Sequence, residues 1–171
     1  MRNPLAPHSQ DVMSRSWAFR VNTVAASPLV SLATRQRLYR RFGLDIETDQ
    51  VYPRCYFHSA DLHVGPGALL NHGVHIENVA RVEIGARTAL GIFTTIITSD
   101  HEIGPPEERC GQWTRRPVTI GSGCWIGARA LLMPGSTVGD GSIVAAGAVV
   151  RGTLEPNGLY AGVPARLVRE L

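Results

Sequence analysis

An aliphatic residue recurs at every sixth position over most of residues 64–150 of this chain. Three runs are in register: Val64, Leu70 and Ile76; Ile84, Leu90 and Ile96; and Ile120, Ile126, Leu132, Val138, Val144 and Val150. An amphipathic helix repeats about every 3.6 residues and a half-buried strand about every two, so neither explains this period. Short strands joined by tight corners, three to a turn, do explain it, because one aliphatic side chain per strand then points inward.

The residues between the aliphatic positions agree with stacked coils. A small or slim residue stands four places after most of them, as at Ala68, Thr88, Cys124 and Ala148, and glycine often follows them directly. Glycine supplies corner dihedrals that other residues avoid. We therefore predict an all-β fold, a parallel β-helix over residues 51–155; crossovers between parallel strands are right-handed as a general rule.

Two interruptions break the register. A slip of two residues between Ile76 and Ile84 predicts a bulge or a widened corner. Between Ile96 and Ile120 the stretch 102–119 takes the place of further repeats and predicts a protruding loop. Long loops in compact folds are usually functional, although a tolerated insertion is the alternative.

Residues 1–50 and 156–171 lie outside the repeats. The segment from Ser14 to Phe42 is helix-compatible, and it contains one candidate apolar face formed by Leu29, Leu32, Ala33, Leu38 and Phe42. We expect this segment to cap the open end of the coil, because solenoids need covered ends; a basic face for an anionic partner or membrane surface is the alternative. In the tail, 165–171 is expected to form a short C-terminal helix.

Composition excludes several classes. The net charge of +3 is too small to indicate a nucleic-acid partner, and the three cysteines lack zinc or disulfide-framework spacing. All seventeen basic residues are arginine, a side chain that suits phosphate recognition. The N-terminal MRNPLAPHSQ has no apolar secretion segment, and the apolar stretch 23–34 is too short for a membrane span. We expect a soluble, cytoplasmic protein.

Three segments, together with the hexads, resemble the hexapeptide-repeat acyltransferases. They are ITSDHEIG (97–104), VTIGSGCWIGARALLMPG (118–135) and AGVPARLVREL (161–171). The similarity covers roughly residues 50–171 and points to the branch of maltose, galactoside and polysaccharide O-acetyltransferases. It implies the left-handed form of the coil, a homotrimer, acetyl-CoA as co-substrate and no metal.

His101 stands at the catalytic position of that family, which implies a general base that takes the proton of an acceptor hydroxyl. Its neighbours Asp100 and Glu102 are not assigned as orienting partners, because neighbours in sequence often point apart. A histidine hydrogen-bonded at a coil corner is the alternative.

Other residues leave two further chemistries open. The rival histidines raise a zinc site of the γ-carbonic anhydrase kind; they are His58, His63, His72 and His75. The transferase-like segment around His101 makes that site less favoured. An acyl intermediate on Cys110 or Cys124 is also disfavoured, since Cys124 takes the small position of a hexad.

Asn71 matches a family asparagine that contacts the acceptor. Counted from Val64, Asn71 lies at offset 7 of its coil. Counted from Ile84, His101 lies at offset 17 of the next coil. The two residues therefore fall on different faces of one chain. They could meet if one comes from a neighbouring subunit, which supports a trimer with sites between chains. The alternative for Asn71 is a tight-corner asparagine.

Small residues at 127–128 and 145–147 would leave main chain exposed along a coenzyme groove. Gly127 is a candidate for this groove because of its size, and the resemblance implies Ala128 and Ala146 along the pantetheine arm, with Trp125 nearby. It also implies three arginines near the nucleotide phosphates, namely Arg151, Arg166 and Arg169. Packing for Trp125 and solvated charge for the arginines are the alternatives.

The acceptor is less specified. Val79 replaces an aspartate that some sugar acetyltransferases use, and the N-terminal region lacks the short helical module of the maltose and galactoside enzymes. We expect acetyl transfer to a hydroxyl of a carbohydrate or glycan precursor. Acetylation of an amino acid or antibiotic, and a non-catalytic scaffold, stay open.

Overall fold

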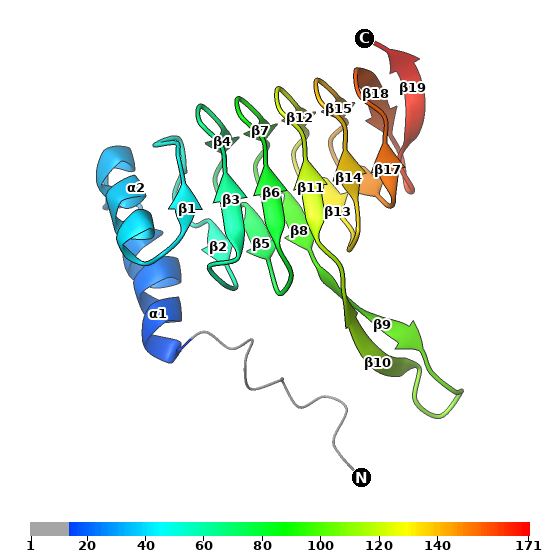
Figure 1. Cartoon of the computed structure of the whole chain (residues 1–171), viewed down its shortest axis with the longest axis horizontal. Helices are drawn as coiled ribbons and strands as arrows, with labels where there is room; N and C mark the ends of the chain where they lie inside the picture. The colour runs from blue at the N-terminus through cyan, green and yellow to red at the C-terminus, as the bar shows by residue number, and fades with distance from the viewer. Residues whose placement is uncertain (1–13) are drawn as a thin grey trace.

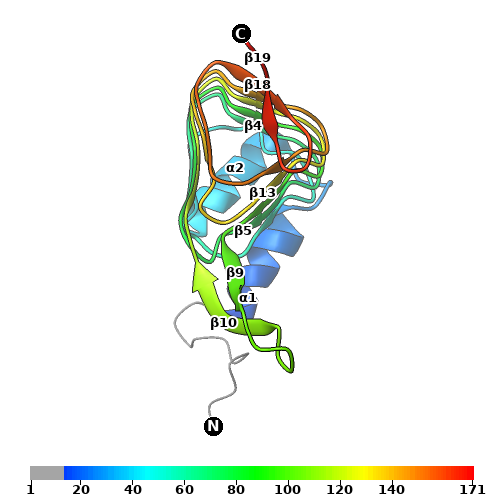
Figure 2. The same ribbon diagram turned by 90° about the vertical axis from the view of Figure 1, so that its right-hand side faces the viewer.

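The structure, a computed structural model, describes residues 14–171, and most of the chain from residue 45 onward winds into a triangular prism of stacked coils (Figure 1). Seen along the axis, the coils superimpose, with a hairpin extending from one corner (Figure 2). The left-handed parallel β-helix expected from the hexads and the resemblance is confirmed. The first thirteen residues, on which the expectation of no secretion segment rests, lie outside the described part.

Three sheets form the sides of the prism, and all pairs within the coils are parallel. The first sheet contains β1 (Asp45–Ile46), β3 (Leu62–Val64), β6 (Val82–Ile84), β11 (Val118–Ile120), β14 (Thr137–Val138) and β17 (Thr153–Leu154). The second contains β4 (Leu69–Leu70), β7 (Ala89–Leu90), β12 (Trp125–Ile126), β15 (Ile143–Val144), β18 (Gly158–Ala161) and β19 (Arg166–Glu170). The third contains β2 (Tyr56–Phe57), β5 (His75–Glu77), β8 (Thr95–Ile97), β13 (Leu131–Leu132) and β16 (Val149–Val150).

We number the corners in chain order. The first corner joins the first and second sheets, the second corner joins the second and third, and the third corner leads back to the first sheet. The sheets lie in register, so equivalent positions of successive coils stack directly, as in the series Val64, Ile84 and Ile120.

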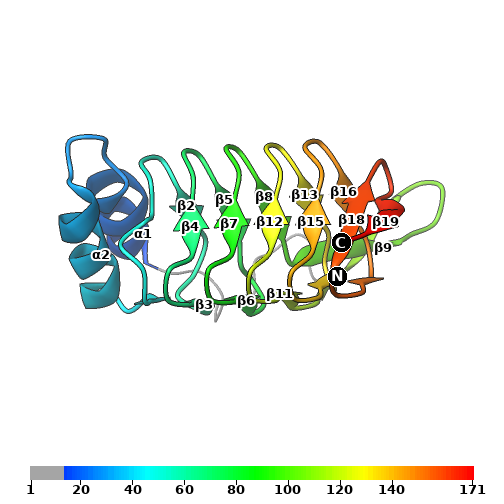
Figure 3. The ribbon, with the colours of Figure 1, turned by 90° about the horizontal axis from the view of Figure 1, so that it is seen from above.

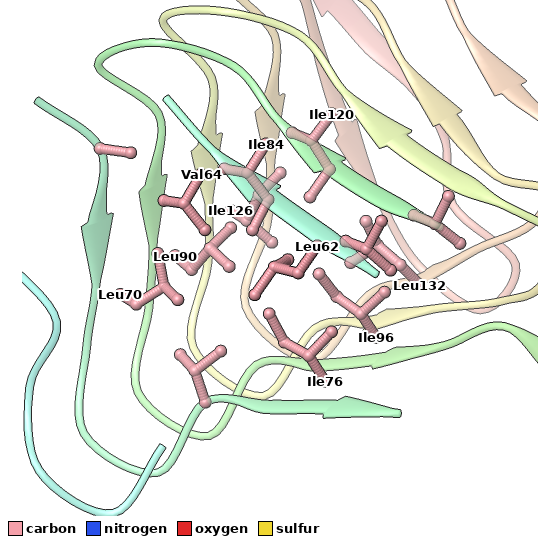
Figure 4. Close-up of a cluster of buried hydrophobic side chains, with 14 of the residues drawn as sticks. Leu62, Val64, Leu70, Ile76, Ile84, Leu90, Ile96, Ile120, Ile126 and Leu132 are labelled. Atoms are coloured by element: carbon pink, nitrogen blue, oxygen red, sulfur yellow. The ribbon is translucent and has the colours of Figure 1, made fainter. Parts of the chain in front are cut away.

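The aliphatic residues of the hexads fill the axis of the prism (Figure 4). Leu70, Leu90 and Ile126 from the second sheet meet Ile76 and Ile96 from the third, and each is fully buried. Polar corner residues bond between coils: the Thr88 hydroxyl donates to the Gly121 carbonyl at 2.6 Å and accepts from the Cys124 amide at 3.0 Å. The period of six therefore reflects one buried aliphatic side chain in each strand of the coil.

The slip between Ile76 and Ile84 is a widened corner between β5 and β6. The two extra residues allow the side chain of Asn78 to turn inward, where it is completely buried. Its amide nitrogen donates to the Ser59 carbonyl at 2.9 Å, and its oxygen accepts from the amides of His58 and Ser59. The wider corner is therefore held to the preceding coil by polar contacts.

Helices cover the N-terminal end of the prism (Figure 3). α1 (Arg15–Phe19) continues into η1 (Arg20–Ala25), and α2 (Leu32–Arg41) packs against η1. The predicted apolar face is partly wrong: Leu29 is 94% exposed and Ala33 is exposed, whereas Leu38 and Phe42 pack partly against the core.

The buried stripe of α2 instead contains Arg35 and Tyr39. The guanidinium of Arg35 donates to the carbonyls of Ala25, Ser27, Val30 and Val51 at 2.7–2.9 Å. A buried charge is tolerated when hydrogen-bond acceptors replace its water, and these four carbonyls do so.

Between β8 and β11 the chain leaves the third corner as an antiparallel hairpin of β9 (Ser99–Ile103) and β10 (Cys110–Arg115). The protrusion therefore starts before residue 102, and Val118 and Thr119 already belong to β11. No coil strand lies between β8 and β11. The residues between them pair with each other as β9 and β10.

The expected C-terminal helix over 165–171 is wrong. Residues 166–170 form β19, which returns antiparallel along β18. A final coil leaves an open edge of backbone donors and acceptors, and a returning strand satisfies that edge while a helix would not. No helix within residues 14–171 has the length and apolarity to cross a bilayer.

Candidate active site

His101 lies half-buried on β9, opposite Trp113 of β10. Its Nδ1 is 2.9 Å from the carbonyl oxygen of Gly111. A carbonyl only accepts, so Nδ1 carries the proton and the neutral ring keeps its lone pair on Nε2. The hairpin therefore sets both the orientation and the tautomer that a general base requires.

The two acidic neighbours do not orient this ring. The Asp100 carboxylate accepts from the backbone amide of His101 at 2.8 Å, and Glu102 is exposed. The orienting group is the backbone of Gly111, which sequence reasoning missed. The pairing of β9 and β10 shifts register between Cys110 and Trp113, and no pattern of residues in the sequence predicts this shift.

Asn71 follows β4 at the second corner. Its side-chain oxygen accepts from the amide of His72 at 2.8 Å and from the ring Nδ1–H of His72 at 3.0 Å. The ring of Tyr52 lies 4.9 Å from that imidazole. Within residues 14–171 nothing pairs with the amide nitrogen of Asn71, so this nitrogen can donate to a ligand.

The second corner also contains the small residues expected along a coenzyme groove. Gly127 and Ala128 follow β12, Ala146 follows β15 one coil later, and the amide of Gly147 donates to the carbonyl of Ala128 at 2.9 Å. Ala146 is exposed and Ala128 half-buried, whereas Gly127 is buried, and a Cβ there would collide with the backbone of Ala146. Close stacking of coils therefore explains Gly127.

Trp125 precedes this corner on β12 and is 59% exposed. It lies between Ala89 and Ile143 on the outer face of the second sheet. Packing inside one chain therefore does not account for it.

Asn71, Ala128 and Ala146 share one corner of the prism, whereas His101 lies on the hairpin from another. The structure thus brings the expected acceptor and coenzyme residues to one edge and separates the expected base from them within a chain.

Comparison with known proteins identifies the family of this chain. The model for the bacterial transferase hexapeptide (six repeats) matches residues 117–152. Nodulation protein L of Rhizobium meliloti (strain 1021) is 36% identical over 155 residues, which are 89% of this chain and 82% of that protein. Galactoside O-acetyltransferase of Escherichia coli (strain K12) is 32% identical over 126 residues, 73% of this chain and 62% of that enzyme.

This chain belongs to the hexapeptide-repeat acetyltransferases. A crystal structure of a member from Vibrio cholerae O1 biovar eltor, complexed with acetyl coenzyme A, superimposes with a TM-score of 0.80 at 28% identity. The match covers 92% of this chain and 86% of that one. The chain spans less than two thirds of the length of the galactoside enzyme.

The three arginines expected near a nucleotide in this hexapeptide-repeat acetyltransferase belong to two segments, β19 and the corner after β16. Arg166 and Arg169 lie on β19, at the end of the sheet that contains Trp125, and Arg166 donates to the Ala165 carbonyl at 2.9 Å. Arg151 follows β16 at the third corner. All three are exposed.

The rival chemistries find less support. Within residues 14–171 the donors that converge come from Asp45, Glu47 and His63, all within 4.8 Å of one another; no three histidines do so. Burial raises the pKa of the Cys124 thiol, which opposes formation of the nucleophilic thiolate. Cys110 is exposed on β10.

Proposed function

We propose that this chain is an acetyl-CoA-dependent O-acetyltransferase that acetylates a hydroxyl of a carbohydrate or glycan precursor. The observation that carries the proposal is the hydrogen bond from His101 Nδ1 to the Gly111 carbonyl, because it makes Nε2 the nitrogen that bears the lone pair in the neutral ring. Family membership supports the donor and the reaction class.

In this mechanism Nε2 of His101 accepts the proton of the acceptor hydroxyl while the oxygen attacks the thioester carbonyl carbon. The tetrahedral intermediate then expels the thiolate of coenzyme A, and the imidazolium returns its proton to that sulfur. The Gly111 carbonyl accepts from Nδ1–H throughout and stabilises the positive ring. No acyl-enzyme is needed, which agrees with the buried position of Cys124.

We further propose that each site forms between chains of a homotrimer, with His101 of one chain beside Asn71 of the next. The outer faces of the sheets support this. The second sheet presents Leu69, Ala89, Trp125, Ile143 and Leu159, and the third presents Tyr56, His75, Thr95, Leu131 and Val149.

The first sheet instead presents Asp45, His63, Glu83, Thr119, Thr137 and Thr153. The outer face of the second sheet is therefore apolar and that of the third sheet is mixed, whereas a charged and polar face lies on the remaining side. Because apolar area favours association, burial of the second corner against a neighbour is the favoured packing. A hairpin from the third corner of that neighbour would then reach Asn71.

The same corner supplies the coenzyme groove in this proposal. Ala128 and Ala146 leave backbone groups accessible to the amides of a pantetheine arm. The exposed corner residues Ile92 and Phe93 add an apolar wall one coil earlier. Arg166 and Arg169 extend from the same sheet toward the nucleotide phosphates, while Arg151 at the third corner fits less well.

The test is a screen of hydroxyl acceptors with acetyl-CoA, read by release of free thiol. The set should contain sugars, glycan repeat units, an amino acid such as serine, and aminoglycoside or chloramphenicol-type antibiotics. We expect acetylation of a carbohydrate hydroxyl by the wild-type chain and none by His101→Ala. Selective acetylation of a non-carbohydrate hydroxyl would contradict the acceptor class, and turnover unchanged in the variant would contradict the base.

A further inference from the structure

Positive charge is concentrated at one end of the prism. Residues 14–44 contain six arginines and no acidic residue, whereas the rest of the chain contains eleven arginines and fourteen acidic residues. The net +3 therefore combines +6 on the helical end with −3 elsewhere. Such asymmetry favours an anionic partner for that end.

One of these arginines is engaged within the fold, and another lies near acidic residues. Arg35 is buried among four carbonyls, and Arg37 is exposed on a pocket that Glu47 and Asp49 also line. Four others are exposed and have no ion-pair partner among residues 14–171: Arg15, Arg20, Arg40 and Arg41.

Exposed apolar side chains lie among the free arginines. Phe19 is 59% exposed and Val24 41% exposed, on the same continuous helical segment as Arg15 and Arg20. Spacings of four and five residues place side chains on one side of a helix that becomes a π-helix. The same segment buries Val21 and Ala25, each next in sequence to an exposed residue, so the exposed side chains are not part of the core.

One contact brings the end of α1 that contains Arg15 to the end of α2 that contains Arg40 and Arg41. The indole N–H of Trp17 donates to the Phe42 carbonyl at 2.8 Å, which ties the start of α1 to the end of α2. We define the cap patch as Arg15, Phe19, Arg20, Val24, Arg40 and Arg41. It lies at the end of the prism opposite β18 and β19 (Figure 3).

We propose that the cap patch binds the surface of an anionic lipid bilayer. Arginine forks pair with lipid phosphates, and Phe19 and Val24 enter the boundary between headgroups and acyl chains. A soluble polyanion would use the arginines and leave the apolar side chains without a role. A second copy of the same patch would bring like charges together.

The test uses the full chain and co-sedimentation with two kinds of vesicle. We expect binding to vesicles of equal parts phosphatidylglycerol and phosphatidylcholine, weakening with salt, and no binding to phosphatidylcholine alone. The double variant Arg15→Gln/Arg20→Gln should bind about 20- to 30-fold more weakly, since each basic residue near such a surface contributes about fivefold. Arg87→Gln, an exposed arginine at the first corner, is the matched control and should bind like the wild type.

A second pair of variants tests the apolar contact. Phe19→Ser should also weaken binding, whereas Ile103→Ser, 87% exposed on the hairpin, should not. Equal thermal midpoints for all variants establish that each is folded. Three results would overturn the proposal: no binding by the wild type, equal binding to neutral vesicles, or dependence on the arginines but not on Phe19 together with competition by a short DNA duplex.

Discussion

The ring of His101 is held by the backbone carbonyl of Gly111, 2.9 Å away across the β9–β10 hairpin. In the neutral ring the proton is thereby on Nδ1, and the lone pair on Nε2 points away from the Gly111 carbonyl. A backbone oxygen performs the orienting role that a carboxylate has in many general-base pairs. Its position depends on the pairing of the two hairpin strands.

Substitution of the proposed base should affect chemistry and leave binding of the donor intact. His101→Ala is expected to lower kcat by about 10²–10⁴, with little change in the KM for acetyl-CoA. Steady-state kinetics at saturating acceptor measure both. A KM that rises while kcat stays constant would show that His101 binds substrate and does not act as the base.

Gly111 can be tested as a positioning residue. A Cβ at this position would lie 2.8 Å from the Glu102 carbonyl oxygen, so Gly111→Ala must shift the hairpin. We expect kcat to fall about tenfold with the thermal midpoint nearly unchanged, because the hairpin lies outside the core. Gln112→Ala, exposed on the same strand, is the control and should keep wild-type kcat. Equal kcat for Gly111→Ala and wild type would argue against the orienting role.

A shared site predicts complementation between inactive variants. His101→Ala and Asn71→Ala are each expected to be nearly inactive, whereas refolding an equal mixture should restore about one quarter of the wild-type activity, because random trimers form that fraction of intact sites. Sedimentation velocity of the wild type should give three chains per particle. A mixture no more active than its components would place both residues in the same chain's site.

Arg166 is expected to contact the 3′-phosphate of coenzyme A. Arg166→Ala should raise the KM for acetyl-CoA about tenfold and that for dephospho-acetyl-CoA much less, as the loss of one charge-assisted hydrogen bond implies. Arg151→Ala serves as the comparison from another corner. Equal effects on the two donors would rule out contact between Arg166 and that phosphate.

Asn78 should matter for stability. Asn78→Ala removes the partners of two backbone amides and of the Ser59 carbonyl in the widened corner, so we expect a loss of about 2–4 kcal/mol in the free energy of unfolding. Urea unfolding monitored by circular dichroism measures it, with Gln112→Ala as an exposed control. A loss below about 0.5 kcal/mol would mean that water replaces these contacts.

Much of the fold could be predicted because the hexads are local and repeated. Each inward position, such as Leu90 or Ile126, makes the same contact with its equivalents in the coils on either side, so a short pattern reports a tertiary environment. The slip before Ile84 likewise predicts a bulge or a widened corner, and the structure has the widened corner. The side chain that fills this corner, Asn78, was not identified, because nothing local distinguishes a buried asparagine from an exposed one.

Counting along the fixed period is enough to predict the coil and its register. Three other features could be seen only in the folded chain. They are the bond between His101 and Gly111, the burial of Arg35 in place of leucine, and the returning strand where a helix was expected. Each depends on backbone groups that meet from separate segments, and such groups are identical in every residue, so side-chain patterns carry no signal of where they pair.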